Sequence, residues 1–86
     1  MVREGDLVAI FHSIHRVMKA EKVLKQAGAD ILLIPVPRQL ASDCGLALRY
    51  SPGVQATVEE ILRREALLPA EIYRRVGQEY LRLDAG

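Results

Sequence analysis

The chain has 86 residues, of which half are apolar and 27% are charged, and its twelve basic and eleven acidic side chains give a formal net charge of +1. This size and balance predict one folded domain over residues 1–86, with a core at about 6–76 and a C-terminal extension at 77–86, and exclude a disordered or fibrous chain. With no basic excess, no tryptophan and no apolar run long enough to cross a bilayer, we expect neither a nucleic acid nor a membrane as partner.

The first part of the chain is predicted to form a strand, a helix and a second strand. Residues 7–11 are a run of mostly β-prone apolar residues, which indicates a short buried strand. Ser13 is placed to cap a helix whose apolar residues recur three and four positions apart, and Gly28 is placed to end it. Residues 30–36 read as a second strand, and Pro35 indicates that it lies at a sheet edge because proline cannot donate to a ladder.

The second part begins with a polar, turn-rich loop at 38–44, after which residues 45–50 resume strand character. Ser51 and Pro52 are predicted to start a second helix, as its cap and its first-turn proline, and the helix is expected to stop near Pro69. Its predicted core-facing residues are Val54, Val58, Ile61, Leu62 and Leu68, and its predicted supporting ion pairs are Glu59/Arg63 and Glu60/Arg64.

The last segment can be read in two ways. Residues 71–76 fit a fourth strand, whereas the spacing of Ile72, Val76, Tyr80 and Leu83 also permits a helix, so strand and helix both stay open for 71–83.

The element order β-α-β-β-α-β predicts an α/β (α+β) protein with the ferredoxin-like split β-α-β two-layer sandwich. In that arrangement the first and third strands are antiparallel neighbours at the centre of the sheet. The end of the first strand, the first turn of the first helix and the loop 38–44 should therefore meet at one edge. An exposed sheet edge would also allow a homodimer.

Cys44 is the single thiol of the chain, and it lies in a loop that can be shaped independently of the core. A helix N-terminus, Arg38 and either His12 or His15 would favour the thiolate and raise its reactivity, whereas Asp43 would oppose it. The alternative is that Cys44 is an inert, small apolar residue packed at the start of a strand. One cysteine without an export signal indicates the cytoplasm.

Other polar residues each have a functional and a structural interpretation. His12, His15 and Cys44 could supply three metal ligands, but an H-x-x-H pair across a strand-to-helix turn is more typical of a polar cap cluster. Arg38 could clamp an anion or be solvated. A basic run on the first helix is most simply a solvated face, although it could dock an acidic partner; its residues are Arg16, Lys19, Lys22 and Lys25.

Several segments together resemble a family of small bacterial proteins described as selenium/sulfur carrier-like, first catalogued as a domain of unknown function. These segments are Phe11-His12-Ser13, Ala20-Glu21-Lys22, Ile34-Pro35-Val36-Pro37-Arg38 and Ser42-Asp43-Cys44-Gly45-Leu46-Ala47-Leu48. The resemblance runs from about Leu7 to Tyr73. Asp43 departs from it, because a small hydroxyl residue is more typical at that position.

The resemblance implies that Cys44 carries sulfur or selenium as a persulfide or selenopersulfide. The donor would be a cysteine desulfurase or a selenide donor, and the recipient an acceptor protein. Arg38 and His12 would stabilise the anionic perthiolate or perselenide, and Gly45 would let a partner approach the backbone closely.

The function predicted from the sequence is thus an accessory carrier rather than a turnover enzyme, without cofactor or bound metal. Its predicted site is Cys44 as the carrier, supported by His12, Ser13, His15, Arg38, Ser42 and Gly45. The first alternative is a non-catalytic interaction or anion-binding module that uses the loop 38–44. The second is a metal-trafficking protein that uses the two histidines and the cysteine.

Overall fold

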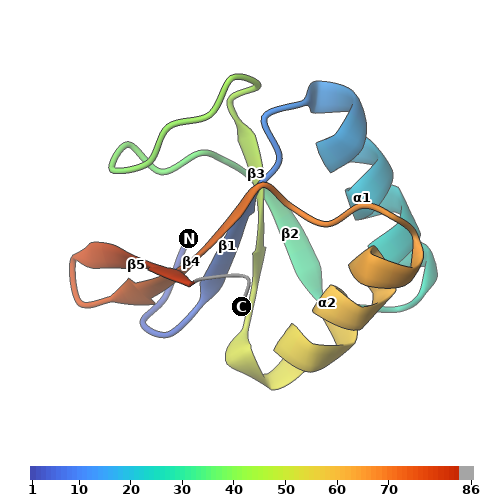
Figure 1. The fold of residues 1–86 in the computed structure, drawn as a ribbon. Coiled ribbons are helices and arrows are strands. Elements are labelled where there is room, and N and C mark those ends of the chain that lie inside the picture. Colours follow the sequence, from blue (N-terminus) through green and yellow to red (C-terminus); the bar gives the residue numbers. More distant parts are fainter. Residues whose placement is uncertain (84–86) are drawn as a thin grey trace.

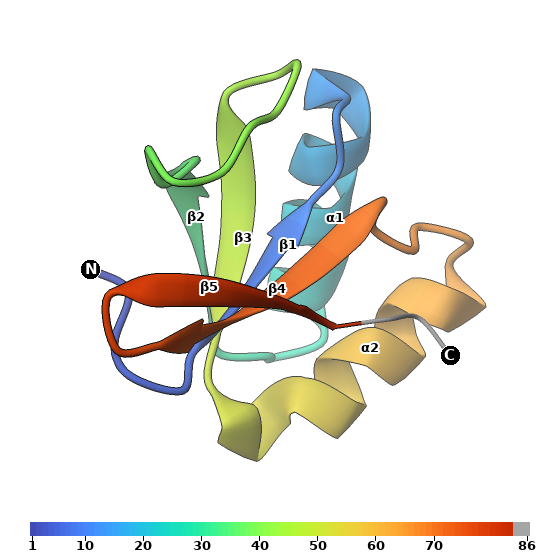
Figure 2. The ribbon, with the colours of Figure 1, turned by 60° about the vertical axis from the view of Figure 1, so that its left-hand side comes forward.

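The computed structural model describes residues 1–83. Within that range the chain forms one five-stranded antiparallel sheet, two α-helices and a short 3-10 helix (Figure 1). The elements are β1 (Leu7–Ile10), α1 (Ile14–Gln26), β2 (Ile31–Pro35), β3 (Leu46–Tyr50), η1 (Pro52–Val54), α2 (Gln55–Arg64), β4 (Glu71–Val76) and β5 (Glu79–Leu83). Both α-helices cover the same face of the sheet, which gives a mixed α+β architecture in two layers (Figures 1 and 2). No helix in residues 1–83 is long and apolar enough to cross a membrane.

The strand order of the sheet is β2-β3-β1-β4-β5. The central strand β1 pairs with β3 on one side and β4 on the other, so that Ala9 is opposite both Leu48 and Ile72. The predicted antiparallel pairing of the first and third strands is confirmed. The predicted edge position of the second strand is also confirmed, since β2 pairs with β3 alone and ends at Pro35.

The segment 71–83 forms two strands and no helix. β4 and β5 pair around a turn at Gly77, whose φ of 60° suits a residue without Cβ. Ile72 lies opposite Leu83 and packs toward the helices, whereas Tyr73 packs on the other face. This alternation has the period of a strand. The predicted order β-α-β-β-α-β is therefore followed by a fifth strand. This strand is formed by part of the predicted C-terminal extension, 77–86. Residues 84–86 of that extension lie outside the described residues.

The second helix differs from its predicted bounds at both ends. A 3-10 turn comes first, with Ser51 at its N-cap position and Pro52 in its first turn as predicted, but Ser51 makes no side-chain hydrogen bond to it. α2 ends at Arg64 because Ala66 adopts a left-handed φ of 57°. That turn buries Leu67 to 4% exposure and leaves Leu68 53% exposed, so the predicted core role of Leu68 is wrong.

The ion pairs predicted along this helix are also wrong. Glu60 pairs with Arg63, one residue earlier than predicted. The Glu59 carboxylate instead accepts hydrogen bonds from the Tyr50 hydroxyl at 2.9 Å and from the Gln55 amide at 3.1 Å. Burial and this carboxylate keep the pKa of the Tyr50 hydroxyl far above its ordinary value of 10.0, so the hydroxyl stays a donor.

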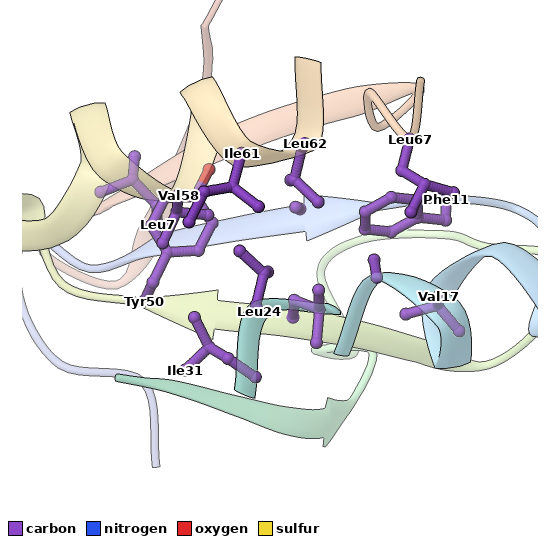
Figure 3. Close-up of a cluster of buried hydrophobic side chains, with 13 residues drawn as sticks. Leu7, Phe11, Val17, Leu24, Ile31, Tyr50, Val58, Ile61, Leu62 and Leu67 are labelled. Carbon is purple, nitrogen blue, oxygen red and sulfur yellow. The ribbon is translucent and has the colours of Figure 1, made fainter. Parts of the chain in front are cut away.

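The core lies between the sheet and the helices (Figure 3). Its buried residues are Leu7, Ala9, Phe11, Val17, Ala20, Leu24, Ile31, Leu48, Tyr50, Val58, Ile61, Leu62 and Leu67. A second, smaller buried cluster on the opposite face consists of Val8, Ile10, Ile34 and Ala47. Val36 and Leu40 pack against this second cluster, so they fix the first half of the loop that leads to Cys44.

Ser13 caps α1 as predicted, since its Oγ accepts the Arg16 amide hydrogen at 3.3 Å. We expect Ser13→Ala to lower the free energy of unfolding by about 1 kcal/mol, because this helix-terminal amide loses its acceptor. Ser51→Ala is the matched control and should have almost no effect, because Ser51 makes no such bond. Urea denaturation measures both; equal losses for the two variants would contradict the assignment.

Candidate functional site

The turn from β1 to α1 and the second half of the loop before β3, which are distant in the sequence, meet at one end of the sheet. The contact between them is a hydrogen bond from the Asp43 backbone amide to His12 Nδ1, at 3.3 Å. In both views the loop approaches the N-terminus of α1 at this point (Figures 1 and 2). The predicted convergence is therefore confirmed for His12 and the residue that precedes Cys44.

His12 links this loop to β4, the strand that pairs with β1 on the side away from β3. Because its Nδ1 accepts a hydrogen bond, its Nε2 carries the hydrogen, and Nε2 donates to Oε2 of Glu71 at 3.2 Å. His12 has a left-handed φ of 58°, which is uncommon for a residue other than glycine. The His12 ring therefore connects the loop to β4 through two hydrogen bonds, while the His12 backbone has a conformation that is unusual for histidine.

Glu71 is a site residue that the sequence analysis missed. It lies opposite Ile10 in the β1–β4 pairing, so the register of the sheet delivers its carboxylate to the histidine that follows β1. Its other oxygen, Oε1, accepts a hydrogen bond from the Tyr73 hydroxyl at 2.7 Å. The strand character of residue 71 was visible in the sequence, but its cross-strand neighbour was not.

The Tyr73 hydroxyl, and then His12, hold the pKa of Glu71 below its ordinary value of 4.5. A lowered carboxyl pKa means that the ionised form is favoured in the folded chain, so its contribution to stability is present above pH 4.5 and is lost as pH falls through the lower, folded value. Carbon-detected NMR titration of Glu71 should give a midpoint below 4.5.

Tyr73→Phe should raise that midpoint, because it removes the larger of the two hydrogen-bond effects on the Glu71 carboxylate. A midpoint that did not move in the Tyr73→Phe variant would contradict the assignment.

Cys44 is half-buried and packs against the core cluster on the helix side of the sheet. Its Sγ–H donates to the Leu46 carbonyl oxygen at 3.4 Å. Ser42 Oγ lies 3.6 Å from Sγ and accepts the Cys44 backbone amide hydrogen at 3.3 Å. The Ser42 hydroxyl is therefore close enough to donate a hydrogen bond to the sulfur.

Gly45 follows the cysteine with a left-handed φ of 75°, and no atom lies within 4 Å of the position that a Cβ would occupy. Its carbonyl oxygen accepts the Val36 amide hydrogen at 3.0 Å, which fastens the two ends of the loop together. The backbone beside Cys44 is therefore both fixed and open to an approaching molecule.

Arg38 and His15 lie apart from the hydrogen bonds around Cys44. Arg38 is exposed in the first half of the loop, where the neighbouring Gln39 side chain donates to the Gln78 carbonyl oxygen at 3.4 Å. Figure 2 draws this half of the loop away from α1. His15 is exposed on α1. Within residues 1–83, neither Arg38 nor His15 makes a hydrogen bond to Cys44 or His12.

The metal-ligand set considered from the sequence does not form in the part of the chain described. Among residues 1–83, no three His, Cys, Asp or Glu side chains gather closely enough to hold a metal ion. His12 uses both ring nitrogens for protein contacts instead, one to the loop and one to Glu71. For His12 this is the polar cluster that was weighed against the metal site, whereas His15 is exposed and takes no part in it.

A cavity of about 470 Å³ lies between α2 and the β4–β5 hairpin, away from Cys44. Glu59, Leu68, Glu71, Ile72 and Arg82 are among its lining residues. Glu71 therefore contacts His12 and also borders this cavity. Cys44 is not among the residues that line the cavity, so the cavity offers no route to the sulfur.

The comparisons with known proteins agree with the resemblance noted in the sequence. The family model described as "Putative Se/S carrier protein-like" matches residues 6–74, a span that includes β1, the loop and β3. No curated protein and no solved structure matches the chain.

Proposed function

Because the chain belongs to the Se/S carrier-like protein family, we propose that it is an accessory carrier that holds a sulfur or selenium atom on Cys44 and passes it to an acceptor protein. The observation that carries this proposal is the family match across residues 6–74, which includes the only cysteine of the chain. A single thiol suits a carrier, because no second thiol is present to resolve a loaded sulfur into an internal disulfide.

The proposed transfer needs no oxidant from outside the reaction. The Cys44 thiol first loses its proton, and the thiolate attacks the outer sulfur of a donor persulfide, R–S–SH. The S–S bond of the donor breaks, R–S⁻ leaves, and Cys44 becomes the persulfide. An acceptor nucleophile then attacks the outer sulfur and releases the Cys44 thiolate, so one sulfur atom at the same oxidation level has moved.

The residues around the sulfur have distinct proposed parts. The Ser42 hydroxyl, 3.6 Å from Sγ, would donate a hydrogen bond to the thiolate or the persulfide. The open space at Gly45 would admit a partner's reactive group to the cysteine. Ser13 would hold the first turn of α1, and its neighbour His12 would hold the loop through the Asp43 amide.

Arg38 and His15 would act without contact to the sulfur. Both are exposed; the positive charge of Arg38 would favour an anionic perthiolate or perselenide, and the His15 ring would be available to a docked partner. Alkylation of Cys44 near neutral pH tests this part, because Arg38→Ala should slow it. An unchanged rate would remove Arg38 from the proposed site.

We also propose that residues 1–86 are one domain of the ferredoxin-like split β-α-β type, located in the cytoplasm. Support for the fold comes from the strand order β2-β3-β1-β4 with two helices on one face, to which β5 adds a fifth strand. Support for the cytoplasm comes from the single cysteine.

Intact-mass spectrometry tests the carrier function. The protein is incubated with a cysteine desulfurase and cysteine, and separately with a selenopersulfide donor, R–S–SeH, whose selenium is already at the oxidation level of the adduct, in the absence of reductant. An adduct of one sulfur or one selenium atom, removed by added thiol, supports the carrier and identifies the element. An unmodified mass in both incubations would contradict it.

A second function, a non-catalytic interaction module, is favoured by one observation. The Cys44 thiol already donates to the Leu46 carbonyl oxygen and packs on the core, as a structural cysteine would. In that case Cys44 would resist alkylation in the native protein, and a Cys44→Ser variant would keep its partner.

A further inference from the structure

The exposed side of α1 carries apolar and basic residues close to the cysteine. We define the α1 outer face as Ile14, His15, Met18, Lys19 and Lys22, all of which are exposed. Spacings of three and four place these residues on neighbouring turns, opposite the buried positions Val17, Ala20 and Leu24. Ile14 and Met18, one turn apart, are each 44% exposed.

The α1 outer face begins near the loop segment that contains Cys44. The Asp43 amide, next to Cys44, is hydrogen-bonded to His12, two residues before α1 begins. In both views this loop approaches the N-terminus of α1 (Figures 1 and 2). A protein that covers the loop beside Cys44 would therefore also reach the first turns of α1.

The charge of the α1 outer face selects among such proteins. Lys19 and Lys22 are its charged residues, and it includes no acidic one. The single carboxylate of the helix, Glu21, is already paired with Lys25. The first turn of α1 contains no acidic residue either, so the positive end of the helix dipole is left uncompensated.

The loop adds one exposed carboxylate near the start of α1, that of Asp43, whereas its exposed cation, Arg38, lies in the half of the loop that is drawn away from α1 (Figure 2). Lys19 and Lys22 outnumber this single carboxylate, so the α1 outer face keeps a basic character.

We infer that the α1 outer face is a docking surface for an acidic protein partner, whose apolar residues contact Ile14 and Met18 while its carboxylates face Lys19 and Lys22. The inference rests on the proposed carrier function, because a carrier must be covered by its donor and by its acceptor at the loaded cysteine. Charge complementarity of this kind raises the rate of encounter and fixes the orientation of the partner.

Two synthetic persulfide peptides test this inference, each with one cysteine persulfide, one flanked by glutamates and the other by lysines. At low ionic strength the acidic peptide should load the protein about tenfold faster than the basic peptide, and high salt should remove the difference. The Lys19→Glu/Lys22→Glu variant should reverse the preference. Equal loading by both peptides at low salt would overturn the docking surface.

A matched pair of single variants separates a local surface from overall charge. Lys22→Glu and Arg3→Glu change the net charge equally, but Arg3 is an exposed residue before β1, at the opposite end of that strand from His12. Lys22→Glu should weaken the preference for the acidic peptide, whereas Arg3→Glu should leave it nearly unchanged. An equal loss in both variants would overturn the inference.

Failure of the carrier function gives a different result. If neither peptide loads the wild-type protein, the carrier proposal fails, and the docking surface is judged by binding alone. The same peptides with serine in place of cysteine are then titrated into the labelled protein. Amide shift changes on α1 with the acidic peptide alone support the docking surface, and their absence overturns it.

Discussion

Replacing Cys44 by serine is expected to abolish covalent loading of both sulfur and selenium. The chain has one cysteine, so no second thiol is present to take over the cargo. A persulfide requires a cysteine sulfur, which serine lacks. The serine hydroxyl is also not appreciably ionised near neutral pH, so it is a far weaker nucleophile than a thiolate. The expected effect is complete loss of the mass adduct.

The change should leave the fold intact. Serine is close in size to cysteine, and the Sγ contacts to the Leu46 carbonyl oxygen and the Ser42 hydroxyl are contacts that a serine hydroxyl also makes. We therefore expect native circular dichroism from the Cys44→Ser variant. Covalently bound sulfur or selenium retained by this folded variant would sink the carrier assignment.

Ser42→Ala is the matched control for this substitution. It removes the hydroxyl that contacts Sγ and accepts the Cys44 amide hydrogen, but it keeps the thiol. The Ser42→Ala protein should still load, at a lower rate, because the thiolate loses one donor and the turn loses one hydrogen bond. Complete loss of loading in this variant would show that the thiol alone does not explain the adduct.

The largest loss of stability is expected from Leu24→Ala. Leu24 is fully buried in α1, in the cluster between the helices and the sheet (Figure 3). Truncation removes apolar contact and leaves a cavity, which costs about 2 to 5 kcal/mol at such sites. In a domain of this size the melting temperature should fall by roughly 10 to 40 °C.

Met18→Ala is the matched control on the same helix. Met18 is 44% exposed, so its truncation creates no enclosed cavity and should change the free energy of unfolding by less than about 0.5 kcal/mol. Thermal and urea unfolding of both variants measure the difference. Similar losses for Leu24→Ala and Met18→Ala would contradict the assignment of the core.

The first three strands and the first helix were predictable because their signals are local. Ser13 caps α1 and Gly28 follows its end with a φ of 79°, as the sequence indicated. Pro35 ends an edge strand, as a residue without an amide hydrogen must. Cys44 was identifiable as a candidate because it is the only thiol and because the motif around it resembles a known family.

The second helix and the last segment were predicted less well, because there the local pattern allowed two answers. Leu67 and Leu68 are both apolar and adjacent, and only the left-handed turn at Ala66 decides which of them is buried. The apolar spacing in 71–83 suited a helix and a strand, and pairing with β1 selected the strand.

The sequence by itself determined the element order up to α2, the cap of α1, the edge strand and the candidate thiol. Only the tertiary structure decided that Glu71 holds His12, that His12 holds the Asp43 amide, and that Arg38 lies apart from them. The first group depends on side chains within a few positions of one another. The second depends on strand register and on the path of a ten-residue loop, which are set by packing between segments far apart in the chain.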